Sequence, residues 1–212
     1  MLTTILFDLD GTLIDSPKII MQGFEAAISK HVDNYQLTHN EKTEILGMTL
    51  TMAFNRFQKD ENHLQEMINT FRNKTEELTL KMLHSYENAE NVIKYLKRQG
   101  YKVGIVTSKS RKVVEMNLEL VGLNNLFDII ITSDDTTLHK PNPEPLIYAT
   151  KKLGVEVFET IYIGDHENDI IAGNNALMKT GLMKYSYRFN EALEHQPTYI
   201  FDDLNHLKKI FW

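Results

Sequence analysis

Acidic residues stand directly after short apolar runs at two points of this sequence. Asp8 and Asp10 follow the apolar residues 4–7, and Asp165 follows a second run, with Asp169 four positions further on. Carboxylates that converge on one place repel each other unless a cation lies between them. Mg²⁺ prefers oxygen ligands and suits a small carboxylate site that keeps bound waters. The acids therefore predict a magnesium site, provided that the fold brings them together.

Three further residues could hold a phosphate group beside these acids. Thr107 and Ser108 follow the apolar residues 102–106, and Lys140 opens a segment rich in proline. A hydroxyl donor and an ammonium group next to a divalent cation are suited to phosphate oxygens. The set predicts metal-assisted phosphate chemistry. Turn capping alone can explain an Asp or a Thr at any one strand end, but it does not explain why they should share one sheet edge.

Such chemistry needs a scaffold that places the ends of separate apolar runs side by side. The runs are short, apolar throughout and bounded by Gly or polar residues, which is typical of buried strands. Helical patterns lie between them, and this alternation predicts a doubly wound, Rossmann-like parallel α/β sheet with ligands beyond the carboxyl ends of its strands. The predicted strands are 4–7, 102–106, 127–131 and 160–163, with weaker candidates at 180–182 and 198–201, and the predicted helices are 91–99, 111–120, 143–153, 168–176 and 202–210.

One long segment interrupts the alternation of strands and helices. Residues 48–99 contain neither Gly nor Pro, and apolar residues recur there near helical spacing. We therefore expect residues 17–84 to form an all-helical insert after the first strand. Residues 1–16 and 85–212 would form the α/β core domain.

Composition limits the classes of protein that remain. The chain has 212 residues, of which 42% are hydrophobic and 25% charged, as expected for one globular domain with a modest insertion. It contains no Cys, which excludes disulfides, thiolate catalysis and cysteine-bound zinc. The net charge of -6 argues against nucleic acid as the main partner. No apolar run approaches a membrane span and no secretory signal is visible, so we expect a cytoplasmic protein without a membrane partner. We also expect a monomer.

The motif residues resemble those of the haloacid dehalogenase-like hydrolase superfamily. Residues 8–12, Asp-Leu-Asp-Gly-Thr, are similar to its first motif, DxDGT, and directly follow the first predicted strand. Thr107, Lys140 and residues 164–169 are similar to the second, third and fourth motifs, in order. The helical insert resembles the C1 cap of the phosphoglycolate-phosphatase-like group, which includes bacterial pyrophosphatases and beta-phosphoglucomutases. Asp10 favours a phosphatase or a mutase, because the dehalogenases of the family lack this second Asp.

The resemblance implies a role for each motif residue. Asp8 would be the nucleophile that forms an aspartyl-phosphate, and Asp10 would be the general acid and base. Mg²⁺ would be bound by Asp8, Asp165 and the backbone carbonyl of Asp10. Asp169 would support the site from behind, reaching the waters of the metal or orienting Lys140. The residues implied to bind phosphate are Leu9 and Ser108 through their backbone N–H groups, Thr107 and Lys140.

The implied activity is that of a Mg²⁺-dependent phosphatase acting on a small phosphorylated metabolite, either a phosphoglycolate-like monoester or pyrophosphate. A beta-phosphoglucomutase-like phosphotransferase and a non-enzymatic Mg²⁺-binding regulatory domain remain alternatives. In the cap, Gly47 and Met48 lie in the implied specificity loop. Arg56 could bind an anionic leaving group or be a solvated helix residue. Hinge motion is expected near residues 15–17 and 85–89.

Four other polar residues are expected to have no part in the chemistry. His166 and Glu167 lie inside the fourth motif, at positions that the family leaves variable, and we expect them to be exposed to solvent. Asp134 and Asp135 are expected to cap a turn. Trp212 is assigned no role.

Overall fold

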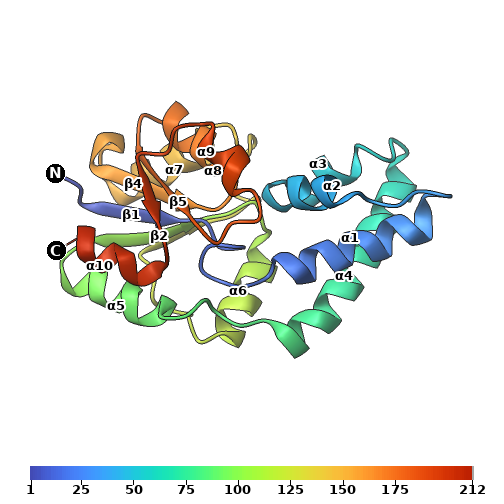
Figure 1. Ribbon diagram of the computed structural model, residues 1–212, viewed down its shortest axis with the longest axis horizontal. Coiled ribbons are helices and arrows are strands. Elements are labelled where there is room, and N and C mark those ends of the chain that lie inside the picture. The colour runs from blue at the N-terminus through green and yellow to red at the C-terminus, as the bar shows by residue number, and fades with distance from the viewer. Residues whose placement is uncertain (212) are drawn as a thin grey trace.

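A six-stranded parallel sheet forms one end of the molecule, and four helices extend from it to form the other (Figure 1). The computed structural model describes residues 1–211, so Trp212 lies outside the described residues. The strand order is β3-β2-β1-β4-β5-β6, and every neighbouring pair is parallel. This confirms the predicted doubly wound α/β fold. The strands are β1 Thr4–Phe7, β2 Lys102–Val106, β3 Ile129–Ile131, β4 Thr160–Gly164, β5 Lys179–Met183 and β6 Tyr199–Phe201.

The register of the central strands brings their ends together. Phe7 at the end of β1 pairs with Ile105 of β2 on one side and with Ile163 of β4 on the other. The chain therefore leaves all three strands at the same edge of the sheet. This edge carries the polar residues that the sequence singled out.

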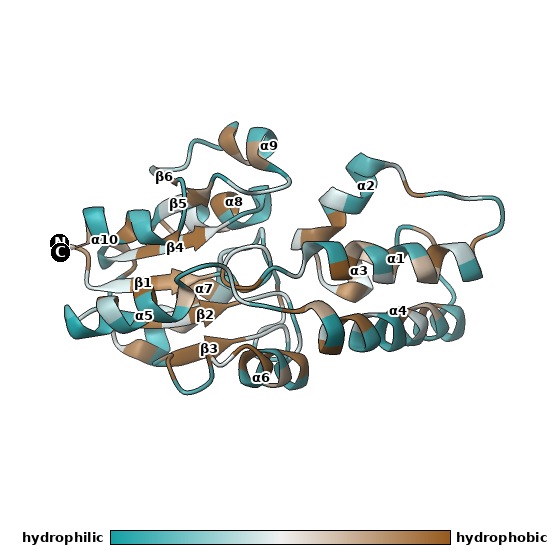
Figure 2. Ribbon diagram, turned by 60° about the horizontal axis from the view of Figure 1, so that its bottom comes forward, coloured by the Kyte–Doolittle hydropathy of each residue, from teal (hydrophilic) through white to brown (hydrophobic). Residues whose placement is uncertain are grey.

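Helices cover both faces of the sheet, as the alternating pattern predicts. Helices α5, α6 and α10 share an apolar cluster with one face, and α7 and α8 share a second cluster with the other face. Figure 2 shows that the strands are mainly apolar, whereas the outer surfaces of the helices are largely hydrophilic. The helices are α5 Ala89–Arg98, α6 Arg111–Leu120, α7 Glu144–Leu153, α8 Glu167–Asn175, α9 Phe189–Leu193 and α10 Leu207–Ile210, with 3-10 turns η2 Val157–Glu159 and η3 Leu204–His206.

The other end of the molecule consists of helices with an apolar cluster of their own. The longest two, α1 and α4, pack against each other (Figure 1). Phe24, Phe54 and Phe71 meet in the interior of this unit, with ring centroids 4.7–6.0 Å apart. The elements are α1 Pro17–His31, α2 His39–Glu44, η1 Ile45–Gly47, α3 Leu50–Phe54 and α4 Glu61–Met82. None of the described helices combines the length and the apolar character needed to cross a membrane.

Two antiparallel chain segments join the helical unit to the sheet. Asp15 donates a backbone hydrogen bond to the carbonyl of His84 at 2.9 Å, and Tyr86 donates one to the carbonyl of Leu13 at 2.9 Å. A bridge between Ile14 and the residue after His84 completes this pairing. The two connections therefore form one narrow joint rather than two independent tethers.

Candidate active site

A buried ammonium group lies among the acids at the carboxyl edge of the sheet. Lys140 is 3% exposed, and its Nζ donates to Asp8 Oδ1 at 2.8 Å, Asp169 Oδ1 at 2.6 Å and the hydroxyl of Tyr162 at 2.9 Å. The tyrosine hydroxyl in turn donates to the carbonyl of Val106 at 2.7 Å. Burial opposes the charge of Lys140, but the two carboxylates hold its pKa well above the usual value. The lysine is thus a fixed positive charge with all its donors in use.

Three buried carboxylates lie close together at this edge of the sheet, and two of them contact Lys140. Asp8, Asp165 and Asp169 each offer an oxygen, and these oxygens lie within 4.8 Å of one another. Burial raises the pKa of Asp8 to about 7 against the opposing effect of Lys140, and it also raises the pKa of Asp165. Ionised carboxylates in such a place need further positive charge. A hard divalent cation with oxygen ligands fits this donor set.

Asp169 differs from the other two acids because both of its oxygens are already in use. One accepts from Lys140, and the other accepts from the backbone N–H groups of Asp165 at 3.1 Å and His166 at 2.9 Å. Burial works against its ionisation, yet Lys140 and these hydrogen bonds lower its pKa below the usual value. Its position fits support of the lysine and of the loop after β4 more closely than direct metal binding.

The first motif turns sharply to bring its residues against Asp165. Gly11 has a φ of +72°, and a Cβ there would lie 2.2 Å from Asp165 Oδ2. Only glycine meets both demands without strain. The next residue, Thr12, donates its hydroxyl to Asp165 Oδ1 at 3.2 Å. The first motif therefore positions Asp165, which follows β4 and lies more than 150 residues away in sequence.

Asp10 is held by a lysine that the sequence did not single out. Lys109 Nζ lies 2.5 Å from Asp10 Oδ1, and the hydroxyl of Ser16 donates to the same oxygen. Lys109 stands two positions after Thr107, whose Oγ1 accepts its backbone N–H at 3.3 Å. The sequence offers one signal for Lys109, namely that it lies in the same loop after β2 as Thr107 and Ser108. The structure thus brings two ammonium groups to the acids rather than one.

The helical unit reaches the site through the turn at Gly47. Its carbonyl accepts from Asn168 Nδ2 at 3.2 Å and lies 3.5 Å from the hydroxyl of Ser108. The prediction that His166 is exposed is wrong: it is 3% exposed and its Nε2 donates to the carbonyl of Glu44 at 3.1 Å. The cause is the turn itself, which lies so close over the ring that a Cβ on Gly47 would be 2.4 Å from Nδ1.

Glu167 is also less exposed than predicted, because it forms an ion pair. Its carboxylate accepts from Arg188 Nη2 at 2.6 Å and from Nε at 3.1 Å, so the ion pair is bidentate. The same guanidinium donates through Nη1 to Asn40 Oδ1 of the helical unit at 2.7 Å. No motif in the sequence marks Arg188 or Asn40, since their positions matter only once the two units meet.

Two of the cap residues that the sequence singled out face partners within the helical unit. Arg56 Nη1 lies 3.1 Å from Glu44 Oε2, so its charge is paired, and it lies in the turn after α3 rather than in a helix. Met48 packs against the apolar cluster of the helical unit. In the core, the side chain of Leu9 is fully buried, which leaves its backbone as the part able to contact a phosphate.

Asp135 caps the turn after β3, as predicted, whereas the side chain of Asp134 contacts the start of α6 instead of its own turn. Asp134 accepts the backbone N–H of Arg111 at 2.8 Å, at the start of α6. Asp135 accepts the backbone N–H and the hydroxyl of Thr132, each at 2.7 Å, and the guanidinium of Arg111 at 2.7 Å. Both acids therefore stabilise the packing of the loop after β3 against α6.

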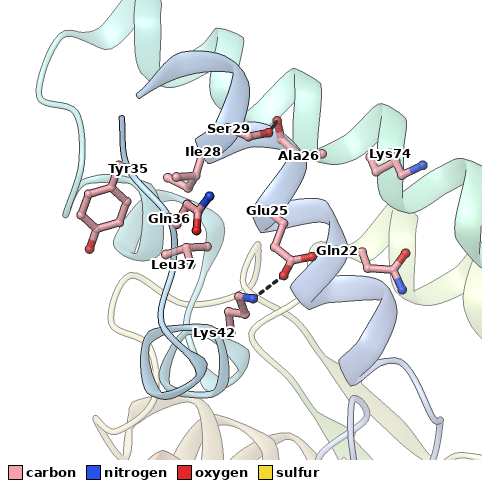
Figure 3. A pocket seen from close by; sticks show the side chains of 10 residues that line it. All are labelled: Gln22, Glu25, Ala26, Ile28, Ser29, Tyr35, Gln36, Leu37, Lys42 and Lys74. Atoms are coloured by element: carbon pink, nitrogen blue, oxygen red, sulfur yellow. Dashed lines mark hydrogen bonds and ion pairs between the residues drawn. The ribbon is translucent and has the colours of Figure 1, made fainter. Parts of the chain in front are cut away.

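A hollow of about 430 Å³ lies on the helical unit between α1, the segment before α2 and α4 (Figure 3). An ion pair joins Lys42 to Glu25 in its lining, which otherwise consists of Lys74 and a mixture of apolar and neutral polar side chains. None of the clustered carboxylates lines it. The chemistry-bearing residues therefore lie elsewhere, at the edge of the sheet.

The capped parallel sheet and the acids at its edge define a class of hydrolases. Residues 5–183 match the model of the family described as haloacid dehalogenase-like hydrolase, and the chain belongs to this family. The predicted family and the prediction of an enzyme are confirmed.

The relatives narrow the class further. Pyrophosphatase PpaX of Bacillus cereus (strain B4264) is 36% identical over 210 residues, which is 99% of this chain and 96% of that protein. The structure of a predicted phosphoglycolate phosphatase from Haemophilus somnus 129PT has a TM-score of 0.85 at 25% identity, covering 100% of this chain and 98% of the other. That of a predicted phosphatase from Clostridium acetobutylicum has a TM-score of 0.84 at 27% identity, covering 99% of both chains. These similarities favour a phosphatase over a dehalogenase, as predicted.

Proposed function

We propose that this protein is a Mg²⁺-dependent phosphatase that hydrolyses pyrophosphate or a small monoester such as phosphoglycolate through an aspartyl-phosphate. The observation that carries the proposal is the buried Lys140, which bridges Asp8 and Asp169 beside a third carboxylate at the carboxyl edge of the sheet. The identity with Pyrophosphatase PpaX over nearly the whole chain supports it.

The metal would be held by Asp8, Asp165 and the backbone carbonyl of Asp10. When bound, Mg²⁺ supplies positive charge between a carboxylate and an anionic phosphate. Hydrogen bonds within the protein already fix the position of Asp165. Thr12 holds one oxygen of Asp165, and the hydroxyl of Ser186 donates to the backbone carbonyl of the same residue.

Two acids would divide the chemistry between them. An oxygen of Asp8 attacks phosphorus while the bond from phosphorus to the leaving oxygen breaks, and Asp10 gives that oxygen a proton. Asp10 then takes a proton from the water that hydrolyses the aspartyl-phosphate, which restores Asp8 and releases inorganic phosphate. The groups that would hold the transferred phosphoryl oxygens are the ammonium of Lys140, the hydroxyl of Thr107 and the backbone N–H groups of Leu9 and Ser108.

Residues 17–84 would act as a cap that closes over this chemistry, with the α/β core formed by 1–16 and 85–212. Support comes from the single joint between the units, near 15–17 and 85–89, and from the contacts of Gly47 with the core. A closed cap excludes water and adds contacts to the leaving group. Gly47 and Met48 belong to the turn that would contribute them.

We also propose a cytoplasmic monomer whose partner is a small phosphorylated metabolite, with neither nucleic acid nor membrane as a partner. The net charge of -6 supports the absence of a nucleic-acid partner, because a negatively charged protein repels a polyanion. A small substrate also agrees with the close approach of the cap turn to the core at Ser108.

Phosphate release from a panel of substrates tests the proposal. The panel contains pyrophosphate, 2-phosphoglycolate and hexose phosphates, each assayed with Mg²⁺ and with EDTA. We expect release that requires the metal and ranks pyrophosphate or phosphoglycolate above the sugars. Isomerisation of a sugar phosphate that depends on a bisphosphate would instead show a mutase. Absence of turnover with every compound, in a folded protein that binds Mg²⁺, would favour a regulatory domain.

A further inference from the structure

We propose that Lys109 recognises negative charge on the leaving group, so that the site selects substrates that release an anion such as phosphate or a carboxylate. This inference rests on the proposed phosphatase function and names its substrate class. The leaving group would then be recognised by a residue of the core rather than by Arg56 of the cap.

The position of Lys109 places it on the leaving-group side of the site. Its Nζ lies 2.5 Å from Oδ1 of Asp10, the residue proposed to protonate the leaving oxygen. The two side chains are 17% and 13% exposed. The backbone of Lys109 is anchored at both its groups, since its N–H donates to Thr107 Oγ1 at 3.3 Å and its carbonyl accepts from Ser133 at 3.0 Å. Because Lys109 contacts Asp10, a change of its side-chain conformation is enough to bring its ammonium group to the leaving group that Asp10 protonates.

The two ammonium groups of the site differ in their freedom to bind a substrate anion. Lys140 is fully buried and held by Asp8, Asp169 and a tyrosine hydroxyl. Lys109 has one carboxylate partner, Asp10, and a flexible four-carbon stem. It can exchange that partner for an incoming anion, whereas three partners hold Lys140 in place beside Asp8.

Two other cations, Arg56 and Arg188, are paired with glutamates rather than with the aspartates at the sheet edge. Arg56 is paired with Glu44 at 3.1 Å, and Arg188 is held by Glu167 at 2.6 Å. Among the ion pairs of residues 1–211, those that involve the four motif carboxylates contain only two lysines, Lys140 and Lys109. Once Lys140 is assigned to the transferred phosphoryl group, Lys109 is the cation that remains for the leaving group.

A pair of substrates of nearly equal size tests this assignment. Hydrolysis of 2-phosphoglycolate releases glycolate, which carries a carboxylate, whereas hydrolysis of 2-hydroxyethyl phosphate releases ethylene glycol, which is neutral. We expect Lys109→Met to lower the ratio of kcat/KM for the first substrate to that for the second by about tenfold or more, because one charge-assisted contact is lost. The ratio for pyrophosphate over 2-hydroxyethyl phosphate should fall in the same way. Lys109→Arg, which keeps the charge, should retain most of both ratios.

Lys112→Met is the matched control, since it removes an exposed charge three residues further on. Its ratios should equal those of the wild type. If Lys109→Met lowers kcat/KM for the charged and the neutral substrates alike and leaves the ratios within twofold of the wild type, Lys109 only positions Asp10 and the inference is wrong. Failure of the wild type to hydrolyse any of the three substrates would overturn the proposed function, and this inference with it.

Discussion

At the scale of single residues, similar side chains acquire different properties from their surroundings. Asp8 and Asp169 both contact Lys140, yet burial raises the pKa of Asp8 to about 7, while hydrogen bonds and the lysine keep the pKa of Asp169 below its usual value. Two carboxyl groups that contact the same lysine thus differ in how readily they ionise. Both depend on a single buried positive charge.

Replacing that charge should destabilise the protein. Lys140→Met leaves buried carboxylates without their cation, and breaking a buried ion pair in this way costs about 3–5 kcal/mol. We expect a decrease of that size in the free energy of unfolding, measured by urea denaturation in EDTA. Lys184→Met is the control, because its ion pair with Asp202 is exposed, and it should have only a small effect. Equal effects of the two substitutions would contradict the account of Lys140.

The raised pKa of Asp8 predicts how stability depends on pH in the absence of metal. Because its pKa rises from 3.8 in the unfolded chain to about 7 on folding, the folded state gains stability from protonated Asp8 at low pH. That contribution is lost as pH rises through about 7, by at most about 1.4 kcal/mol per pH unit. Asp8→Asn cannot ionise, so its stability relative to the wild type should improve between pH 5 and pH 8. Urea denaturation in EDTA at both pH values measures this difference, and a difference that does not change with pH would contradict it.

At the scale of elements, the sequence predicts the sheet well and the contacts between units poorly. The strands 102–106 and 160–163 and the helix 111–120 are recognisable because apolar runs and helical spacing are local signals. The burial of His166 is not, because it depends on a carbonyl 122 residues away in sequence. Lys109 was missed for the same reason: only the fold shows that it meets Asp10.

The turn at Gly47 provides a test at this scale. Gly47→Ala would place a Cβ 2.4 Å from the ring of His166, so the turn must move away from the core. We expect kcat/KM to fall on the order of tenfold to a hundredfold, since small displacements of positioning groups are costly. Steady-state kinetics, with circular dichroism to confirm folding, provides the measurement.

A second substitution shows whether the clash is the cause. All of the nearest atoms to the added Cβ belong to His166, so His166→Ala removes the obstacle. The double variant should therefore lose less activity than the product of the two single losses. Strictly multiplicative losses would mean that Gly47 acts in some other way than through contact with this ring.

At the scale of the whole molecule, the site lies where two separately packed units meet. Metal binding should therefore stabilise the folded chain as a whole, because the unfolded chain cannot assemble carboxylates that are more than 150 residues apart. Saturating Mg²⁺ at ~100 times its Kd should add about 2.7 kcal/mol, and for a chain of this size that raises Tm by about 5–10 °C.

The stabilisation should depend on the buried acids and not on acidic residues in general. Differential scanning calorimetry with Mg²⁺ and with EDTA gives the shift in Tm for each variant. Asp165→Asn should abolish most of the shift, whereas Asp202→Asn, which changes an exposed acid, should preserve it. An undiminished shift in Asp165→Asn would place the metal somewhere other than the site at the sheet edge.

Substitution of Asp8 tests directly whether this residue attacks a phosphate group in a metal-bound site. Phosphate release from pyrophosphate and 2-phosphoglycolate is measured for the wild type and for Asp8→Asn, each with Mg²⁺ and with EDTA. We expect the wild type to release phosphate with Mg²⁺ and not with EDTA, and Asp8→Asn to lose about a thousandfold or more of this activity, because the covalent route is closed. Comparable release by folded Asp8→Asn would contradict this role of Asp8.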